Sequence, residues 1–151
     1  MPSSSLSTNR VKFVVAYDGG DFCGWAAQAE QRTVQGILTE AVRRISGEEN
    51  EIWGASRTDS GAHAKGQVCH FDTEIPMPVE KWVRVLNRVL PTDLAVLDSC
   101  QVPDDFHSRF WVVNRWYRYR IVTSSPPDPH RIRWVHQFGR DLDLEAMQKA
   151  A

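Results

Sequence analysis

Apolar residues between positions 11 and 102 follow strand-like and helix-like periods in the order β-α-β-β-α-β, and this succession restricts the possible folds most. The first helix is expected to begin at the N-cap residue Thr33 and to end at Gly47. The order is that of the ferredoxin-like fold, an α+β fold whose antiparallel sheet carries both helices on one face. The predicted strands are 11–17, 51–56, 67–71 and 94–102, and the predicted helices are 33–46 and 79–90.

The chain continues past this unit. We predict a long further strand over 112–123 that extends the sheet, a proline-rich turn, a short strand within 134–139, and a helix that starts at Leu142 or Asp143. The predicted organisation is a disordered tail at 1–10, a ferredoxin-like domain at 11–110, and a second, truncated domain at 111–151. Because the last helix has no room to bury its apolar side, we expect the chain to be the first part of a longer protein.

Composition limits the class of protein. The chain has 151 residues, 42% of them hydrophobic and 25% charged, as in an ordinary globular protein. No run approaches the roughly 20 apolar residues of a membrane helix, so no membrane association is expected. The three cysteines form no CxxC pair, which indicates reduced thiols and a cytoplasmic protein.

Charge is distributed unevenly along the chain. The net charge of −1 argues against a uniformly basic nucleic-acid binder. Residues 106–140, however, contain seven arginines and a single acidic residue, Asp128. Arginine suits forked binding of phosphate, so a local anion-binding face is expected in this segment.

The segment 54–73, GASRTDSGAHAKGQVCHFDT, places Asp59 on a short loop between two predicted strands, with Arg57 two residues earlier. A carboxylate on a rigid loop beside an arginine is a candidate reactive group, and the arginine would favour its charged form. The alternative is a solvated Asp-Ser-Gly turn. Composition does not decide between the two.

Six blocks in order show that the chain resembles the TruA family of tRNA pseudouridine synthases over residues 11–151. The blocks are YDGGDFCGW at 17–25, RTVQGILTEAV at 32–42, GASRTDSGAHAKGQVCHFDT at 54–73, LNRVLPTDLAV at 86–96, VPDDFHSRF at 102–110 and RWYRYRI at 115–121. The resemblance implies isomerisation of uridine to pseudouridine in the anticodon arm of tRNA, at positions 38 to 40. It also implies that no cofactor and no metal take part, and that the complete protein is a homodimer.

The resemblance assigns roles to particular residues. Asp59 corresponds to the catalytic nucleophile, Arg57 to its basic partner and Tyr117 to the tyrosine that stacks on the target base. Attack of the carboxylate on C1′ or on C6 of the base remains open. The predicted phosphate-binding arginines include Arg109, Arg115 and Arg118, together with Arg120, Arg131 and Arg133.

Other interpretations stand beside these. On pattern alone Tyr117 is a packing residue of a strand. His63 could shape the Asp59 loop, and the spacing of His63, His70 and His107 does not suit a metal site. The alternatives to an enzyme are an RNA-binding module of the same fold and an inactive fragment. Because family members carry a second half that completes the active-site cleft, we expect this chain alone to bind tRNA weakly and to turn over little.

Overall fold

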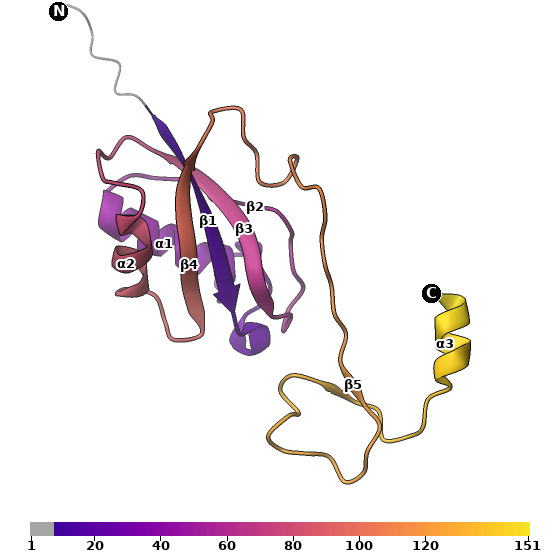
Figure 1. The fold of residues 1–151 in the computed structure, drawn as a ribbon. Coiled ribbons are helices and arrows are strands. Elements are labelled where there is room, and N and C mark those ends of the chain that lie inside the picture. Colours follow the sequence, from indigo (N-terminus) through magenta and orange to yellow (C-terminus); the bar gives the residue numbers. More distant parts are fainter. Residues whose placement is uncertain (1–7) are drawn as a thin grey trace, which may run out of the picture. The chain divides into compact units, whose positions relative to one another are not determined.

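The computed structural model describes residues 8–151, which divide into a first unit that ends at Asn114 and a second unit from Arg115 to Ala151. Figure 1 shows the elements along the chain. Those of the first unit are β1 (Asn9–Tyr17), the 3-10 helix η1 (Gly19–Asp21), α1 (Val34–Ser46), β2 (Trp53–Gly54), β3 (Ala64–Thr73), α2 (Lys81–Asn87) and β4 (Leu94–Val102).

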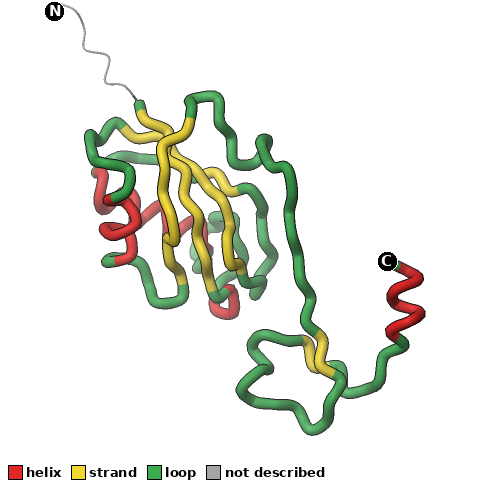
Figure 2. The backbone as a smooth tube through the Cα atoms, in the orientation of Figure 1, coloured by secondary structure: helices red, strands yellow, loops and turns green. Residues whose placement is uncertain are grey.

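The strands of the first unit form one sheet with the order β2-β3-β1-β4. Each neighbouring pair is antiparallel, with Phe13 of β1 opposite Cys69 of β3 and opposite Ser99 of β4. Both helices lie to one side of this sheet (Figure 2). The prediction of an α+β fold with an antiparallel sheet is therefore confirmed.

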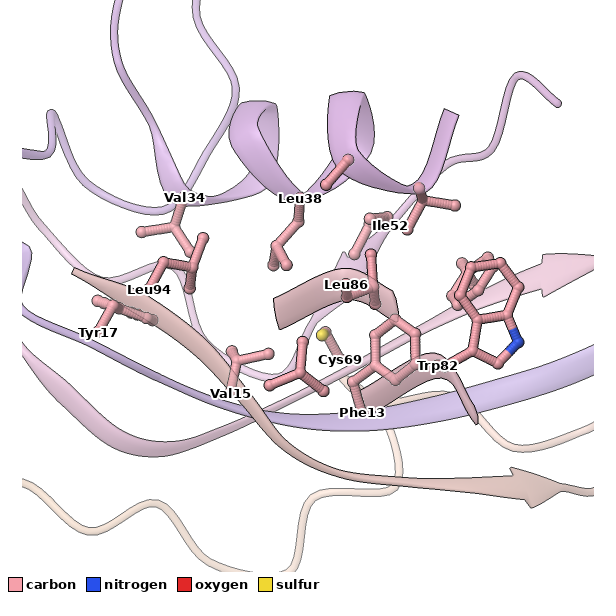
Figure 3. Close-up of a cluster of buried hydrophobic side chains, with 14 of the residues drawn as sticks. Phe13, Val15, Tyr17, Val34, Leu38, Ile52, Cys69, Trp82, Leu86 and Leu94 are labelled. Carbon is pink, nitrogen blue, oxygen red and sulfur yellow. The ribbon is translucent and has the colours of Figure 1, made fainter. Parts of the chain in front are cut away.

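The core lies between this sheet and its two helices. Alternate residues of β1 are buried on the helix side, with Phe13 and Val15 fully inaccessible to solvent. Figure 3 shows Val34 and Leu38 of α1 pointing toward the strands, where Cys69 and Val15 lie. Since each fully buried large apolar side chain contributes about 1.5–3 kcal/mol, this interface is the main source of stability for the unit.

Local sequence signals predicted both helices of the first unit, but some ends of the helices and strands differ from the prediction. Thr33 accepts a hydrogen bond from the Gly36 N–H, and Gly47 ends α1 in the left-handed conformation, as predicted. Helix α2 is shorter than the predicted 79–90, because after Asn87 the chain tightens into a turn in which the Val89 N–H binds the Leu86 carbonyl. Strand β2 covers only two of the six predicted residues, and its pairing with β3 ends just before the Asp59 loop.

The second unit holds β5 (Ile121–Val122) and β6 (His136–Gln137), which pair in parallel, and α3 (Leu144–Ala150). The prediction of a long strand over 112–123 is wrong for most of its length, and Figure 2 draws the connection to β5 as a loop. A strand requires a neighbouring strand, and in the described part of the chain this segment pairs as a strand only at Ile121 and Val122. The last helix begins as predicted, with Asp143 accepting from the Ala146 N–H.

Within residues 8–151, no helix is long and apolar enough to cross a bilayer. All three cysteines are free thiols, with Cys69 buried and Cys23 and Cys100 half-buried. Burial raises the pKa of the Cys69 thiol.

Candidate active site

Asp59 lies where the sequence predicted it, on the loop between β2 and β3. The Ala55 N–H donates to the Val68 carbonyl at 2.8 Å, which closes the base of the loop, and the Ala62 N–H donates to the Asp59 carbonyl at 3.0 Å. Along the loop Arg57 and Asp59 are exposed, whereas Thr58 between them is half-buried. The Asp59 carboxylate therefore faces solvent from a loop whose ends are fixed by the sheet.

The segment that follows β1 supports this loop from beneath. The Trp25 N–H donates to the Thr58 carbonyl at 3.0 Å, and the Gly61 N–H donates to the Phe22 carbonyl at 3.2 Å. The Ser60 hydroxyl reaches the same Phe22 carbonyl at 3.3 Å. A fixed backbone of this kind lets a carboxylate keep one position without reorganisation, as a nucleophile requires.

Two glycines allow the close approach of the two segments. A Cβ atom on Gly19 would lie 1.9 Å from the Ala62 carbonyl oxygen, and one on Gly24 would lie 2.8 Å from the Thr58 carbonyl oxygen. Gly24 also has a φ of +81°, which other residues adopt only with strain. No local pattern in the sequence indicates that the segment after β1 touches the Asp59 loop.

His63 ties the far end of the loop to the same segment. Its Nδ1 accepts the Gly19 N–H at 3.0 Å and lies 3.1 Å from a carboxylate oxygen of Asp18. The hypothesis that His63 shapes the loop is thus supported by its contacts. Residues 8–151 hold no cluster of three or more His, Cys, Asp or Glu side chains suited to a metal ion.

Arg57 and Asp59 are neighbours in sequence, yet no hydrogen bond or ion pair joins their side chains in the described structure. The backbone at these positions is not a strand, so strand alternation does not place the two side chains on one face. Both side chains nevertheless leave the loop on its exposed side. The loop therefore exposes a carboxyl group and a guanidinium group to solvent.

The face of the sheet opposite the helices carries a second group of functional candidates. Residues 103–111 are attached to this face by Arg10, which forms two hydrogen bonds with Asp72 at 2.7 and 2.8 Å and donates to the Phe106 carbonyl at 2.8 Å. The same bonds to Arg10 lower the pKa of Asp72. Arg109 is exposed next to this anchor, and its backbone N–H donates to His107 Nδ1.

His70 is the buried centre of this attachment. Its Nδ1 lies 2.9 Å from the Ser108 hydroxyl and accepts the Ser108 N–H at 3.2 Å, and the hydroxyl also donates to the Trp53 carbonyl at 2.7 Å. The ring centroids of His70 and His107 are 4.8 Å apart. Burial, together with the charge of Arg10, lowers the pKa of His70 to about 4. The sequence did not identify this cluster.

The remaining predicted residues belong to the second unit: Tyr117 and the arginines at positions 115, 118, 120, 131 and 133. Tyr117 is 62% exposed, so it is not a core residue of this chain. Its role in stacking, and the roles of the arginines, remain predictions.

A hollow of about 310 Å³ lies on the first unit near Asn9, Met77 and Trp82. Asn9 begins β1 and Tyr17 ends it, so the hollow and the Asp59 loop are at opposite ends of the strand. The candidate site is therefore the exposed loop itself. An open loop of this kind suits a macromolecular substrate better than a small molecule that binds in an enclosed pocket.

Comparison with known proteins identifies the family of the chain. The family model for tRNA pseudouridine synthase matches residues 13–111. A protein of Halalkalibacterium halodurans named tRNA pseudouridine synthase A is 43% identical over 143 residues, which is 94% of this chain and 54% of the relative. Relatives of the same name from Moorella thermoacetica and Maridesulfovibrio salexigens are 43% and 46% identical, over 93% of this chain in each case and 58% and 52% of the relative. The chain thus spans little more than half the length of the curated relatives it matches, and it belongs to the tRNA pseudouridine synthase family.

Proposed function

We propose that this chain supplies the Asp59-bearing part of a tRNA pseudouridine synthase that isomerises uridine in the anticodon arm, at positions 38 to 40. The observation that carries the proposal is the Asp59 loop: an exposed carboxylate whose backbone is bound to the segment after β1 at Thr58 and Gly61. The named relatives support the same reaction.

The reaction requires a nucleophile and a way to move protons. The N1–C1′ bond breaks, a C5–C1′ bond forms, C5 loses its proton and N1 gains one, so no outside reactant is consumed. Asp59 provides the carboxylate that attacks C1′ or C6. Since an RNA helix stacks its bases inside, the target nucleotide is flipped out to reach the loop.

In this proposal the arginine-rich segment 106–140 binds the substrate. Arg109, Arg115 and Arg118 contact phosphates, and Tyr117 stacks on the uracil. The exposure of Arg109 beside a firmly attached segment supports its part in this.

The fold of the first domain and the assembly of the active protein are part of the same proposal. The strand order β2-β3-β1-β4 with two helices on one face supports a ferredoxin-like first domain. The active protein is a cytoplasmic homodimer in which a second half completes the cleft.

Tritium release from tRNA labelled at C5 of uridine tests the function, with the full-length protein that contains this chain. Asp59→Asn should abolish release while thermal unfolding stays within a few degrees of wild type, because the exposed side chain has no packing role. Asp98→Asn, an exposed aspartate of β4, is the matched control and should keep full activity. Release that survives Asp59→Asn would exclude Asp59 as the nucleophile.

A further inference from the structure

We infer that Tyr17 is a positioning residue for Asp59, acting through a hydroxyl–hydroxyl hydrogen bond to Thr58. The inference rests on the proposed function, since it assumes that Asp59 is the reacting group. Tyr17 is the last residue of β1, and its Oη lies 2.8 Å from Thr58 Oγ1.

Tyr17 is held firmly enough to act as an anchor. It is 4% exposed, and its ring lies among the aromatic side chains of Phe22 and Trp25, with centroids 6.3 and 6.4 Å away. Figure 3 shows the ring at one end of the buried cluster, near Leu94 and Val34. Its hydroxyl is therefore a fixed point that belongs to the sheet and not to the loop.

Thr58 transmits this position to the reactive residue. The exposure of the loop alternates, with Arg57 and Asp59 outward and Thr58 inward. Because Thr58 and Asp59 share a peptide bond, fixing the side chain and the carbonyl of Thr58 restricts the backbone from which the Asp59 carboxylate projects. The Trp25 N–H fixes the Thr58 carbonyl, and the Tyr17 hydroxyl fixes the direction of the Thr58 side chain.

The expected effect is on the chemical step. A single hydrogen bond of this type contributes only about 0.5–1.5 kcal/mol to stability, so the variants should fold. A displaced nucleophile, by contrast, can cost up to about 100-fold in rate. Tyr17→Phe, which deletes one oxygen, should lower kcat by roughly 10- to 100-fold and leave KM within about two-fold.

The variants Tyr17→Phe, Thr58→Val, Thr58→Ser and the double variant Tyr17→Phe/Thr58→Val test the bond by tritium release. Thr58→Ser keeps the hydroxyl and should retain most of the activity, while the double variant should be no slower than the worse single variant. Tyr119→Phe, at an 89% exposed position, is the matched control and should behave as wild type. A Tyr17→Phe protein with wild-type kcat, or single-variant effects that multiply in the double variant, would overturn the inference.

A second readout separates this inference from the proposed function. In Tyr17→Phe, hydrogen exchange at the Gly61 and Ala62 amides of the 151-residue chain should speed up, whereas the amides of β1 and β3 should keep their rates. Wild-type protein without tritium release would refute the proposed function alone, because the exchange experiment still reports on the anchor. Unchanged exchange at both loop amides would refute the anchor whatever the activity.

Discussion

His70 should make the stability of the first unit depend on pH in a range where ordinary histidines are already protonated. The side chain is 2% exposed and contacts Ser108 through its Nδ1. Burial is the main cause of its lowered pKa, and the charges of Arg10 and His107 add to it, while Asp72 acts in the opposite sense. The perturbation that tests this is His70→Asn, which keeps a hydrogen-bonding group near Nδ1 and removes the titrating ring.

The direction and size of this pH effect follow from the linkage between proton binding and folding. The unfolded chain protonates His70 at a pKa near 6.5 and the folded chain at about 4. Between these values the unfolded state holds more protons, so the free energy of unfolding is highest above pH 6.5 and falls as the pH drops toward 4. With about 1.4 kcal/mol for each pKa unit, the loss from this one residue is about 3 kcal/mol.

Urea unfolding followed by circular dichroism, at pH 7 and at pH 4, measures the effect. Wild type should lose about 3 kcal/mol more than His70→Asn between the two pH values, because all other groups titrate alike in both proteins. The His70 ring resonance in an NMR titration is an independent control and should shift near pH 4. Equal pH dependence in the two proteins, or a His70 resonance that titrates near 6.5, would refute the reasoning.

Two further predictions concern the loop support and the basic segment. Gly19→Ala should lower the free energy of unfolding by about 1–3 kcal/mol, because its Cβ would collide with the Ala62 carbonyl; Gly66→Ala, whose nearest atom would be 3.8 Å away, is the control and should change it by less than about 0.5 kcal/mol. If both variants unfold alike in urea, the close approach is not structurally important. Arg115→Ala in the full-length protein should weaken tRNA binding and reduce the slope of log affinity against log salt by roughly one. A filter-binding slope equal to that of wild type would remove Arg115 from the phosphate contacts.

The elements that could be predicted are those whose signals are local. Thr33 and Gly47 bound α1 because a cap and a left-handed stop act within one turn, and 94–102 was predicted to the residue as β4. The prediction of a strand over 112–123 was wrong because an alternating residue pattern indicates only the ability to pair. The partner of a strand lies elsewhere in the chain.

The candidate site, too, could be predicted only where its signals are local. Asp59 was placed on its loop by glycines and flanking strands, which are local. The support for that loop was missed, since Tyr17 and Thr58 are 41 positions apart and Gly19 and His63 are 44 apart. The role of His70 was missed for the same reason, because its partner Ser108 is 38 residues away.

The contact between Gly19 and the Ala62 carbonyl has a consequence for protein engineering. Because backbone meets backbone there, no side-chain exchange on either segment can make room for a different partner. A hybrid enzyme that imported only residues 55–63 from a relative would bring in one half of a matched pair. The transplantable unit is the Asp59 loop together with residues 17–25, although the two are separated by a whole helix and a strand.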